Sequence, residues 1–135
     1  MVARSIRLNA VFVGMFALIG LSALVYAADA AKEAAMAARH AGLASKAADV
    51  KAVHTHLHHV VNCLVGPKGE GFDANEANPC ASLGDGAIPD TTDSAMKTML
   101  MDALKTANAG LGSDDLATAQ KNAAETAATL TKKTM

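Results

Sequence analysis

The chain has 135 residues, of which 51% are hydrophobic and 19% are charged, and its formal net charge is −1. This length suits one domain, the hydrophobic content excludes a disordered chain, and the balanced charge excludes a basic nucleic-acid-binding protein. Aromatic residues make up only 3% of the chain. The apolar residues are therefore mainly alanine, leucine, valine and methionine, which favours closely packed helices over β-sheet structures.

The first segment, residues 1–27, has the features of a secretory signal peptide. Two arginines precede an uncharged apolar run that ends at Tyr26, and the small residues around it predict cleavage after Ala27. Because the run is about long enough to cross a bilayer, an uncleaved membrane-anchor helix is the alternative. Both interpretations make the protein periplasmic or exported, with residues 28–135 forming a single helical domain.

Two helices are expected before the chain reaches its first prolines. Residues 29–41 are rich in alanine, lysine, glutamate and methionine, which are good helix formers, and Gly42 is expected to end this helix. Ser45 is then expected to cap a second helix that runs to about Val65. The short connection predicts a helical hairpin.

A long irregular loop is expected at residues 66–92, because all three prolines and five glycines lie there. The only two cysteines, Cys63 and Cys80, are predicted to form a disulfide in an oxidising compartment. This bond would close a loop of about fifteen residues, worth roughly 3 kcal/mol. The acidic stretch 73–78 lacks the EF-hand order of ligands and is expected to be solvated. Phe72 is expected to pack the loop onto the helices.

Two further helices are expected after the loop. The third begins at Thr91, Thr92 or Asp93 and ends near Gly110, and Ser113 is expected to cap the fourth. The turn at residues 108–113 resembles the turn at 40–45, with a glycine stop, a buried leucine and a serine start. Because a hairpin cannot bury its apolar face alone, the two hairpins predict an all-α, antiparallel four-helix bundle.

The concentrated chemical signal is a group of histidines on the second predicted helix. Four of the five histidines, His54, His56, His58 and His59, lie within six residues. A stripe of valines and leucines on the same helix faces the core. His54 and His58, one turn apart, lie on one shoulder of this stripe. His56 lies on the opposite shoulder, and His59 is expected to point mainly to solvent.

Two imidazoles one turn apart can bind a single transition metal ion, and nitrogen ligands favour copper or zinc. We therefore predict that His54 and His58 are the principal ligands, assisted by His56 or His59. Two ligands alone bind weakly, so a tight site needs further donors. Candidates for these donors are Met96, Met99, Met101, Asp102 and His40.

The fifth histidine, His40, lies near the first predicted turn. A turn near residues 43–45 would place residues 33–35 opposite His54, which argues against His40 as a ligand. Alternatives to a specific metal site remain open. An exposed histidine cluster can bind metals adventitiously or form a pH-sensitive surface, and methionines are more often core residues than ligands.

The sequence also bears on enzymatic, haem-binding and structural functions. The sequence has no G-x-S-x-G, HExxH or glycine-rich phosphate loop, so we do not expect an enzyme. It has no CxxCH motif for covalent haem, although a haem held by histidine and methionine within the bundle is a further alternative. The main alternative is a non-catalytic structural or accessory subunit of a membrane or extracellular assembly, in which a protein partner or an oligomer completes the thin core.

The predicted export signal, the alanine-rich helical hairpins at 29–65 and 93–132, and the histidines near a helix seam resemble small periplasmic metal-binding proteins of proteobacteria. The histidines that carry this resemblance are His40, His54, His56, His58 and His59. The resemblance implies a four-helix bundle that binds copper, nickel or zinc. The chain departs from that pattern in two ways: its second hairpin has no histidine, and it contains the loop between the two cysteines. The resemblance therefore implies one or two sites and not high-capacity binding.

Overall fold

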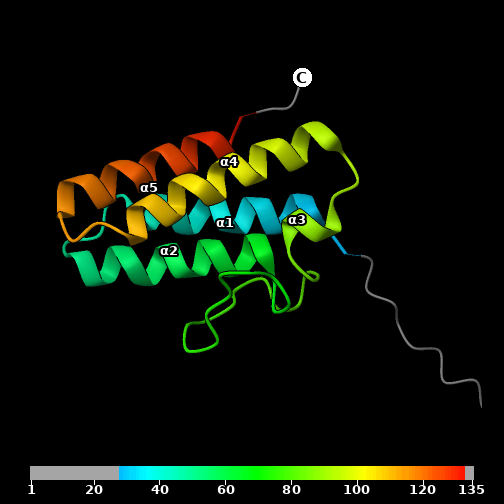
Figure 1. Cartoon of the computed structure of the whole chain (residues 1–135), viewed down its shortest axis with the longest axis horizontal. Coiled ribbons are helices and arrows are strands. Elements are labelled where there is room, and N and C mark those ends of the chain that lie inside the picture. Colours follow the sequence, from blue (N-terminus) through cyan, green and yellow to red (C-terminus); the bar gives the residue numbers. More distant parts are fainter. Residues whose placement is uncertain (1–27, 133–135) are drawn as a thin grey trace, which may run out of the picture.

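A computed structural model describes residues 28–132, and this part of the chain is all-helical, as predicted. Four long helices lie side by side, and a short helix precedes the third of them (Figure 1). The helices are α1 (Ala30–Ala44), α2 (Val50–Val65), α3 (Ala87–Asp90), α4 (Ser94–Leu111) and α5 (Leu116–Leu130). The predicted signal or anchor helix lies outside the described residues. Within residues 28–132, no helix has the length and apolar character needed to cross a membrane.

An aspartate caps the N-terminus of each long helix. In every case its carboxylate accepts a hydrogen bond from the backbone N–H three residues later, at 2.6 to 3.0 Å. This bond satisfies a free donor of the first turn, and the negative charge favours the positive end of the helix dipole. The four caps are Asp29, Asp49, Asp93 and Asp115.

The turns of both hairpins lie later in the chain than predicted. Helix α1 continues through Gly42, and Ser45 ends it: the Ser45 hydroxyl donates to the Gly42 carbonyl at 2.9 Å. Asp49, and not Ser45, caps α2, so the first turn occupies residues 45–49. Similarly, Asp115 replaces Ser113 as the cap of α5. A glycine inside a helix costs only about 1 kcal/mol, which the aspartate cap and the packing offset.

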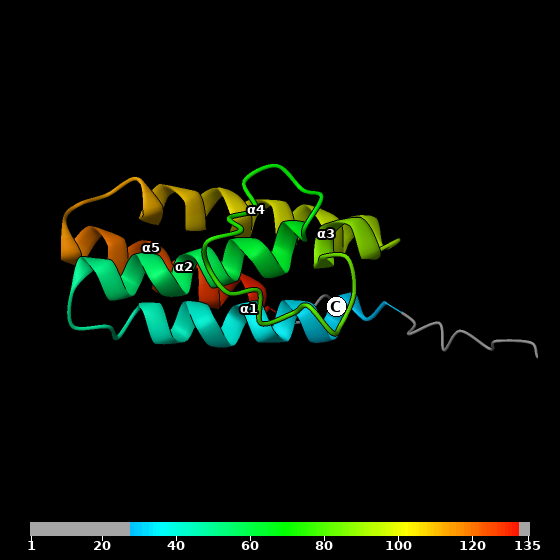
Figure 2. The ribbon, with the colours of Figure 1, turned by 90° about the horizontal axis from the view of Figure 1, so that it is seen from below.

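Alanines allow the helices to pack closely around one core. Helix α1 contacts α2 and α5, and α4 contacts α5 and α2 (Figures 1 and 2). The predicted apolar stripe of α2 is buried, apart from Val50 at its start, which is partly exposed. Leu43, which was expected to be buried, is 44% exposed. The fully buried alanines of α1 and α5 are Ala37, Ala41, Ala44, Ala119 and Ala123.

The predicted disulfide between Cys63 and Cys80 is confirmed, with the two Cα atoms 5.1 Å apart and both residues buried. It joins the end of α2 to a loop that passes over the outer face of that helix (Figure 2). Phe72 is partly buried and packs against the core, as expected. The segment 66–92 is mostly irregular, but it also contains α3. The loop therefore forms a layer over one side of α2.

Candidate metal centre

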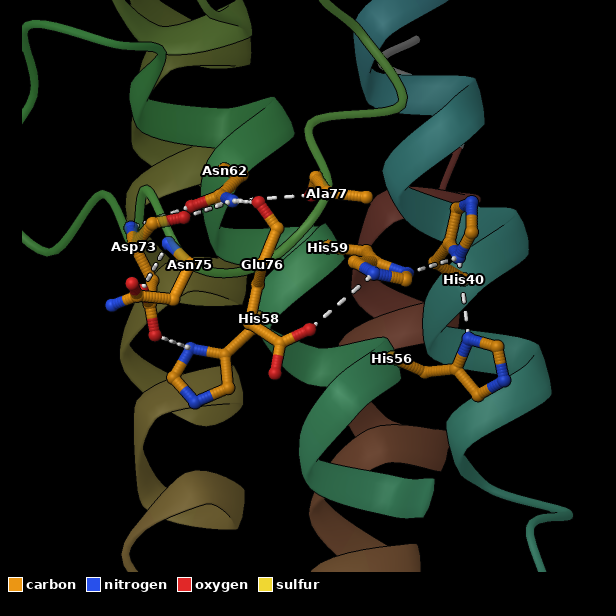
Figure 3. A network of polar contacts seen from close by, with 9 residues as sticks. All are labelled: His40, His56, His58, His59, Asn62, Asp73, Asn75, Glu76 and Ala77. Atoms are coloured by element: carbon orange, nitrogen blue, oxygen red, sulfur yellow. Dashed lines mark hydrogen bonds and ion pairs between the residues drawn. The ribbon is translucent and has the colours of Figure 1, made fainter. Parts of the chain in front are cut away.

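Three histidines from two helices form a cluster: His40 of α1, and His56 and His59 of α2. The Nδ1 atom of His40 lies 3.4 Å from Nδ1 of His56 and 3.3 Å from Nδ1 of His59 (Figure 3). The ligand nitrogens of the three residues all lie within 4.8 Å of one another. In the part of the chain that the structure describes, these three side chains lie close enough together to hold one metal ion.

The position of the first turn explains why His40 joins this cluster. When a short turn joins two antiparallel helices, residues that lie the same number of positions before and after the centre of the turn are opposite each other. The turn at residues 45–49 is centred near residue 47, which places His40 opposite about residue 54, and the contacts of His40 reach His56 and His59 within the next turn and a half of α2. The expectation that His40 lies away from the other histidines was wrong, because the turn was placed at 43–45.

The distances within the cluster match those of a metal-bound set of imidazoles. When zinc is bound tetrahedrally at about 2.0–2.1 Å from each nitrogen, neighbouring ligand nitrogens are about 3.3–3.4 Å apart. The two short Nδ1–Nδ1 distances, 3.3 and 3.4 Å, equal this edge length. Two of the three pairs of nitrogens are thus spaced as on a tetrahedral ion, and the third pair lies within 4.8 Å, so ligation by all three histidines would leave a fourth position for water or another ligand.

The surroundings of the cluster favour neutral imidazoles. Burial, together with the neighbouring charges of His59, His56 and Arg39, lowers the pKa of His40 from 6.5 to about 4. Burial is also the main cause that lowers the pKa of His59. A metal ion binds a ring nitrogen that carries no proton. At neutral pH, protons therefore compete only weakly with a metal ion for these two residues. His40 and His59 can therefore bind a cation at neutral pH without first losing a proton.

The two histidines predicted as principal ligands lie outside the cluster. His54 Nε2 contacts the carbonyl oxygen of Ser113 at 2.9 Å, in the turn between α4 and α5. His58 Nδ1 lies 3.6 Å from a carboxylate oxygen of Asp73 in the loop. The prediction that His59 points to solvent was wrong, since its side chain is only 14% exposed. The structure thus brings together His56 and His59 with His40 and separates His54 and His58 from them.

The other donors considered from the sequence are also placed elsewhere. Met96 and Met99 line a cavity with Ala31, near the start of α1, whereas His40 lies nine residues further along that helix. At 1.5 Å per residue, this separation is about 13 Å. Met101 is 55% exposed, and Asp102 is also exposed. Met96 and Met99 pack against the core, as expected of core residues.

Sequence reasoning missed the loop residues that cover the histidines. Glu76 places a carboxylate oxygen 3.9 Å from Nε2 of His59. The fully buried Asn62 of α2 bonds to the loop backbone at Asp73 and Ala77 (Figure 3). Asn62 interrupts a run of apolar residues in the sequence, and this was the available signal for a structural role. The loop is therefore held against the site and not merely solvated.

Comparisons with known proteins add no relatives: no family model matches the chain, and no curated protein or solved structure is significantly similar to it. The resemblance to periplasmic metal-binding proteins thus stays a prediction. What is established about the site is its geometry, namely a three-histidine cluster that could hold a metal ion.

Proposed function

We propose that this protein is a metal-binding protein that holds one transition metal ion, Zn²⁺ or Cu²⁺, through His40, His56 and His59. The observation that carries the proposal is the pair of Nδ1–Nδ1 distances, 3.3 and 3.4 Å, which suit ligands on a single ion. All three ligands are imidazoles, which favour zinc, copper or nickel over calcium or magnesium. The proposed ligand set replaces the pair His54 and His58.

A role in binding fits the site better than a role in catalysis. Three protein ligands leave one open coordination position, which alone would also fit a catalytic metal. A catalytic metal site also needs groups that position a substrate and transfer protons. In the described residues, Glu76 places its carboxylate beside the cluster, 3.9 Å from Nε2 of His59. The carboxylate therefore does not face Nδ1 of His59, the nitrogen that lies beside Nδ1 of His40. We therefore propose a carrier, buffer or structural role for the ion.

The first experiment is a titration of the full chain with Zn²⁺ and, separately, with Cu²⁺ by calorimetry. We expect one ion per chain with micromolar or tighter affinity. His40→Ala, which removes the nitrogen shared by both short contacts, should weaken binding at least tenfold. His54→Ala is the matched control, because His54 lies on α2 with the ligands His56 and His59 but outside the cluster, and this variant should bind as the wild type does.

Two outcomes would contradict this assignment. One is a His40→Ala variant that binds metal as tightly as the wild type, together with a His54→Ala variant that has lost binding. This result would support the pair His54 and His58 that was predicted from the sequence. The other is wild-type binding no tighter than that of an unstructured histidine-rich peptide. Unfolding curves of each variant, measured without metal, separate a lost ligand from a lost fold.

We also propose that the four long helices form an antiparallel four-helix bundle and that the protein works in the periplasm or outside the cell. The bundle is supported by the packing of α1 against α2 and α5, and of α4 against α5 and α2. The location is supported by the signal-like segment 1–27 and by the disulfide, which is typical of oxidising compartments. Intact mass of the protein from its native host tests the location, since cleavage predicts a chain that begins at Ala28.

A further inference from the structure

We propose that Glu76 is a positioning residue for the metal ligand His59, and that Asn62 and the disulfide hold the loop so that Glu76 faces this ring. The inference rests on the proposed metal site and concerns what sets its affinity. It assigns a role to the loop between Cys63 and Cys80, which otherwise adds stability without an evident function.

His59 links the cluster to the loop through its two ring nitrogens. Nδ1 lies 3.3 Å from Nδ1 of His40, inside the cluster, while Nε2 lies 3.9 Å from a carboxylate oxygen of Glu76 (Figure 3). The side chain of His59 is 14% exposed and that of Glu76 is 33% exposed, so the contact is only partly open to water. One nitrogen is thus available to a metal ion, and the other faces a negative charge.

The backbone on both sides of Glu76 is fixed by one buried side chain. The Asn62 amide donates hydrogen bonds to the carbonyl oxygens of Asp73, at 2.9 Å, and Ala77, at 3.1 Å. Its oxygen accepts a hydrogen bond from the Asp73 N–H at 2.9 Å. Asn62 is fully buried and directly precedes Cys63, whose disulfide ties the end of the same loop to α2. The position of Glu76 is therefore set by two anchors one residue apart.

This arrangement has a specific consequence for metal binding. A neutral histidine that binds a metal through Nδ1 carries its proton on Nε2, and a carboxylate near that proton stabilises this tautomer and makes the ring a better ligand. A separation of 3.9 Å is too long for a hydrogen bond, so the Glu76 carboxylate acts through its charge. Loss of such an outer partner typically weakens binding about 10- to 100-fold, and we expect about tenfold here because Glu76 is partly exposed.

The test measures Zn²⁺ affinity of the full, disulfide-bonded chain by competition with a chromophoric chelator. Glu76→Ala should bind Zn²⁺ about tenfold more weakly than the wild type. Glu70→Ala, which removes an exposed carboxylate from the same loop, is the matched control and should leave the affinity unchanged. Glu76→Asp, which keeps the charge, should restore part of the loss. Equal affinities of Glu76→Ala and Glu70→Ala would overturn the inference.

A second measurement separates this inference from the proposed function. Nitrogen-15 NMR of the metal-free protein reports which ring nitrogen of His59 carries the proton. We expect the Nε2–H tautomer in the wild type and a gain of the Nδ1–H tautomer in Glu76→Ala. An unchanged tautomer would refute the role of Glu76 even if His40→Ala shows that the metal site is correct. If the wild type binds no Zn²⁺, the proposed function fails, and the tautomer still decides whether Glu76 orients His59.

Discussion

Glu33 leads to a prediction about the pH dependence of stability. This residue of α1 is fully buried, and one of its carboxylate oxygens accepts a hydrogen bond from the Gly86 N–H at 3.0 Å. The pKa of Glu33 is raised from 4.5 to about 7, mainly by burial, and the nearby charges of Asp90 and Asp85 contribute to this increase. A protonated Glu33 can donate a hydrogen bond to the Asp90 carboxylate, which an ionised one cannot.

The sign of the effect follows from proton binding. Between pH 4.5 and about 7, the folded protein keeps the Glu33 proton that the unfolded chain has already lost. The contribution of Glu33 to the unfolding free energy is therefore complete below pH 4.5, falls as the pH rises through this window, and is lost above about 7. At 1.36 kcal/mol per pKa unit this shift corresponds to about 3 kcal/mol, and we expect about 2 kcal/mol because relaxation of the surroundings partly screens a buried charge.

The assay is urea unfolding of the wild type and of Glu33→Gln at intervals from pH 4 to pH 8. Glutamine mimics the protonated acid, so we expect the stability of Glu33→Gln relative to wild type to increase by about 2 kcal/mol across this range. The difference between the two proteins is the diagnostic quantity. The partly buried His40, with a pKa lowered from 6.5 to about 4, contributes the opposite slope in both proteins. A difference that does not change with pH would refute the reasoning.

Four further predictions concern packing and the loop. Gly42→Ala should stabilise the protein by about 0.5–1 kcal/mol, because nothing lies within 4 Å of the added Cβ and alanine favours a helix. Gly110→Ala should instead destabilise it by about 1 kcal/mol, because its Cβ would lie 2.7 Å from a leucine methyl group of α2; equal shifts in chemical denaturation would contradict this. Replacing Cys63 and Cys80 together with alanine should cost about 3 kcal/mol in urea unfolding, and no measurable change would refute the stabilising role of the bond. Phe72→Ala should cost about 1–2 kcal/mol, because Phe72 packs against the core, and an unchanged melting temperature would show that it does not fasten the loop.

Local patterns in the sequence were sufficient to predict the four long helices, the disulfide and the buried stripe of α2, but not the short helix α3. Each depends on nearby residues: helix formers, a cysteine pair, and apolar side chains at helical spacing. The metal site depends on something less local, the register between α1 and α2. Because each residue added to a helix rotates it by about 100° and lengthens it by 1.5 Å, ending α1 at Gly42 and not at Ala44 misplaces His40 relative to His56.

The choice between serine and aspartate as a cap caused that error. Both residue types cap helices well, and Ser45 lies three residues after Gly42, where a glycine is a common place for a helix to stop. In the structure Ser45 bonds backward to Gly42, while Asp49 bonds forward to Ala52 at 2.8 Å. The competition between them is decided by the packing of the whole hairpin, which the local sequence does not contain.

The roles of Asn62 and Glu33 could be predicted even less. Each is an isolated polar residue on an otherwise apolar helix face, and Glu33 lies at four-residue spacing from the buried Ala37. This position signals burial but not the partner. Their partners are backbone groups of the loop, whose path depends on glycines with positive φ such as Gly71 and Gly86. Such a path is set by many weak turn preferences at once.

The most direct test of the central claim is a crystal structure of the Zn²⁺-loaded protein, with anomalous scattering recorded at the zinc absorption edge. We predict a single ion about 2.0–2.1 Å from the ring nitrogens of His40, His56 and His59, with its fourth position open to water or an added ligand. An ion bound instead by His54 or His58, or the absence of zinc from the three-histidine cluster, would contradict the proposed site.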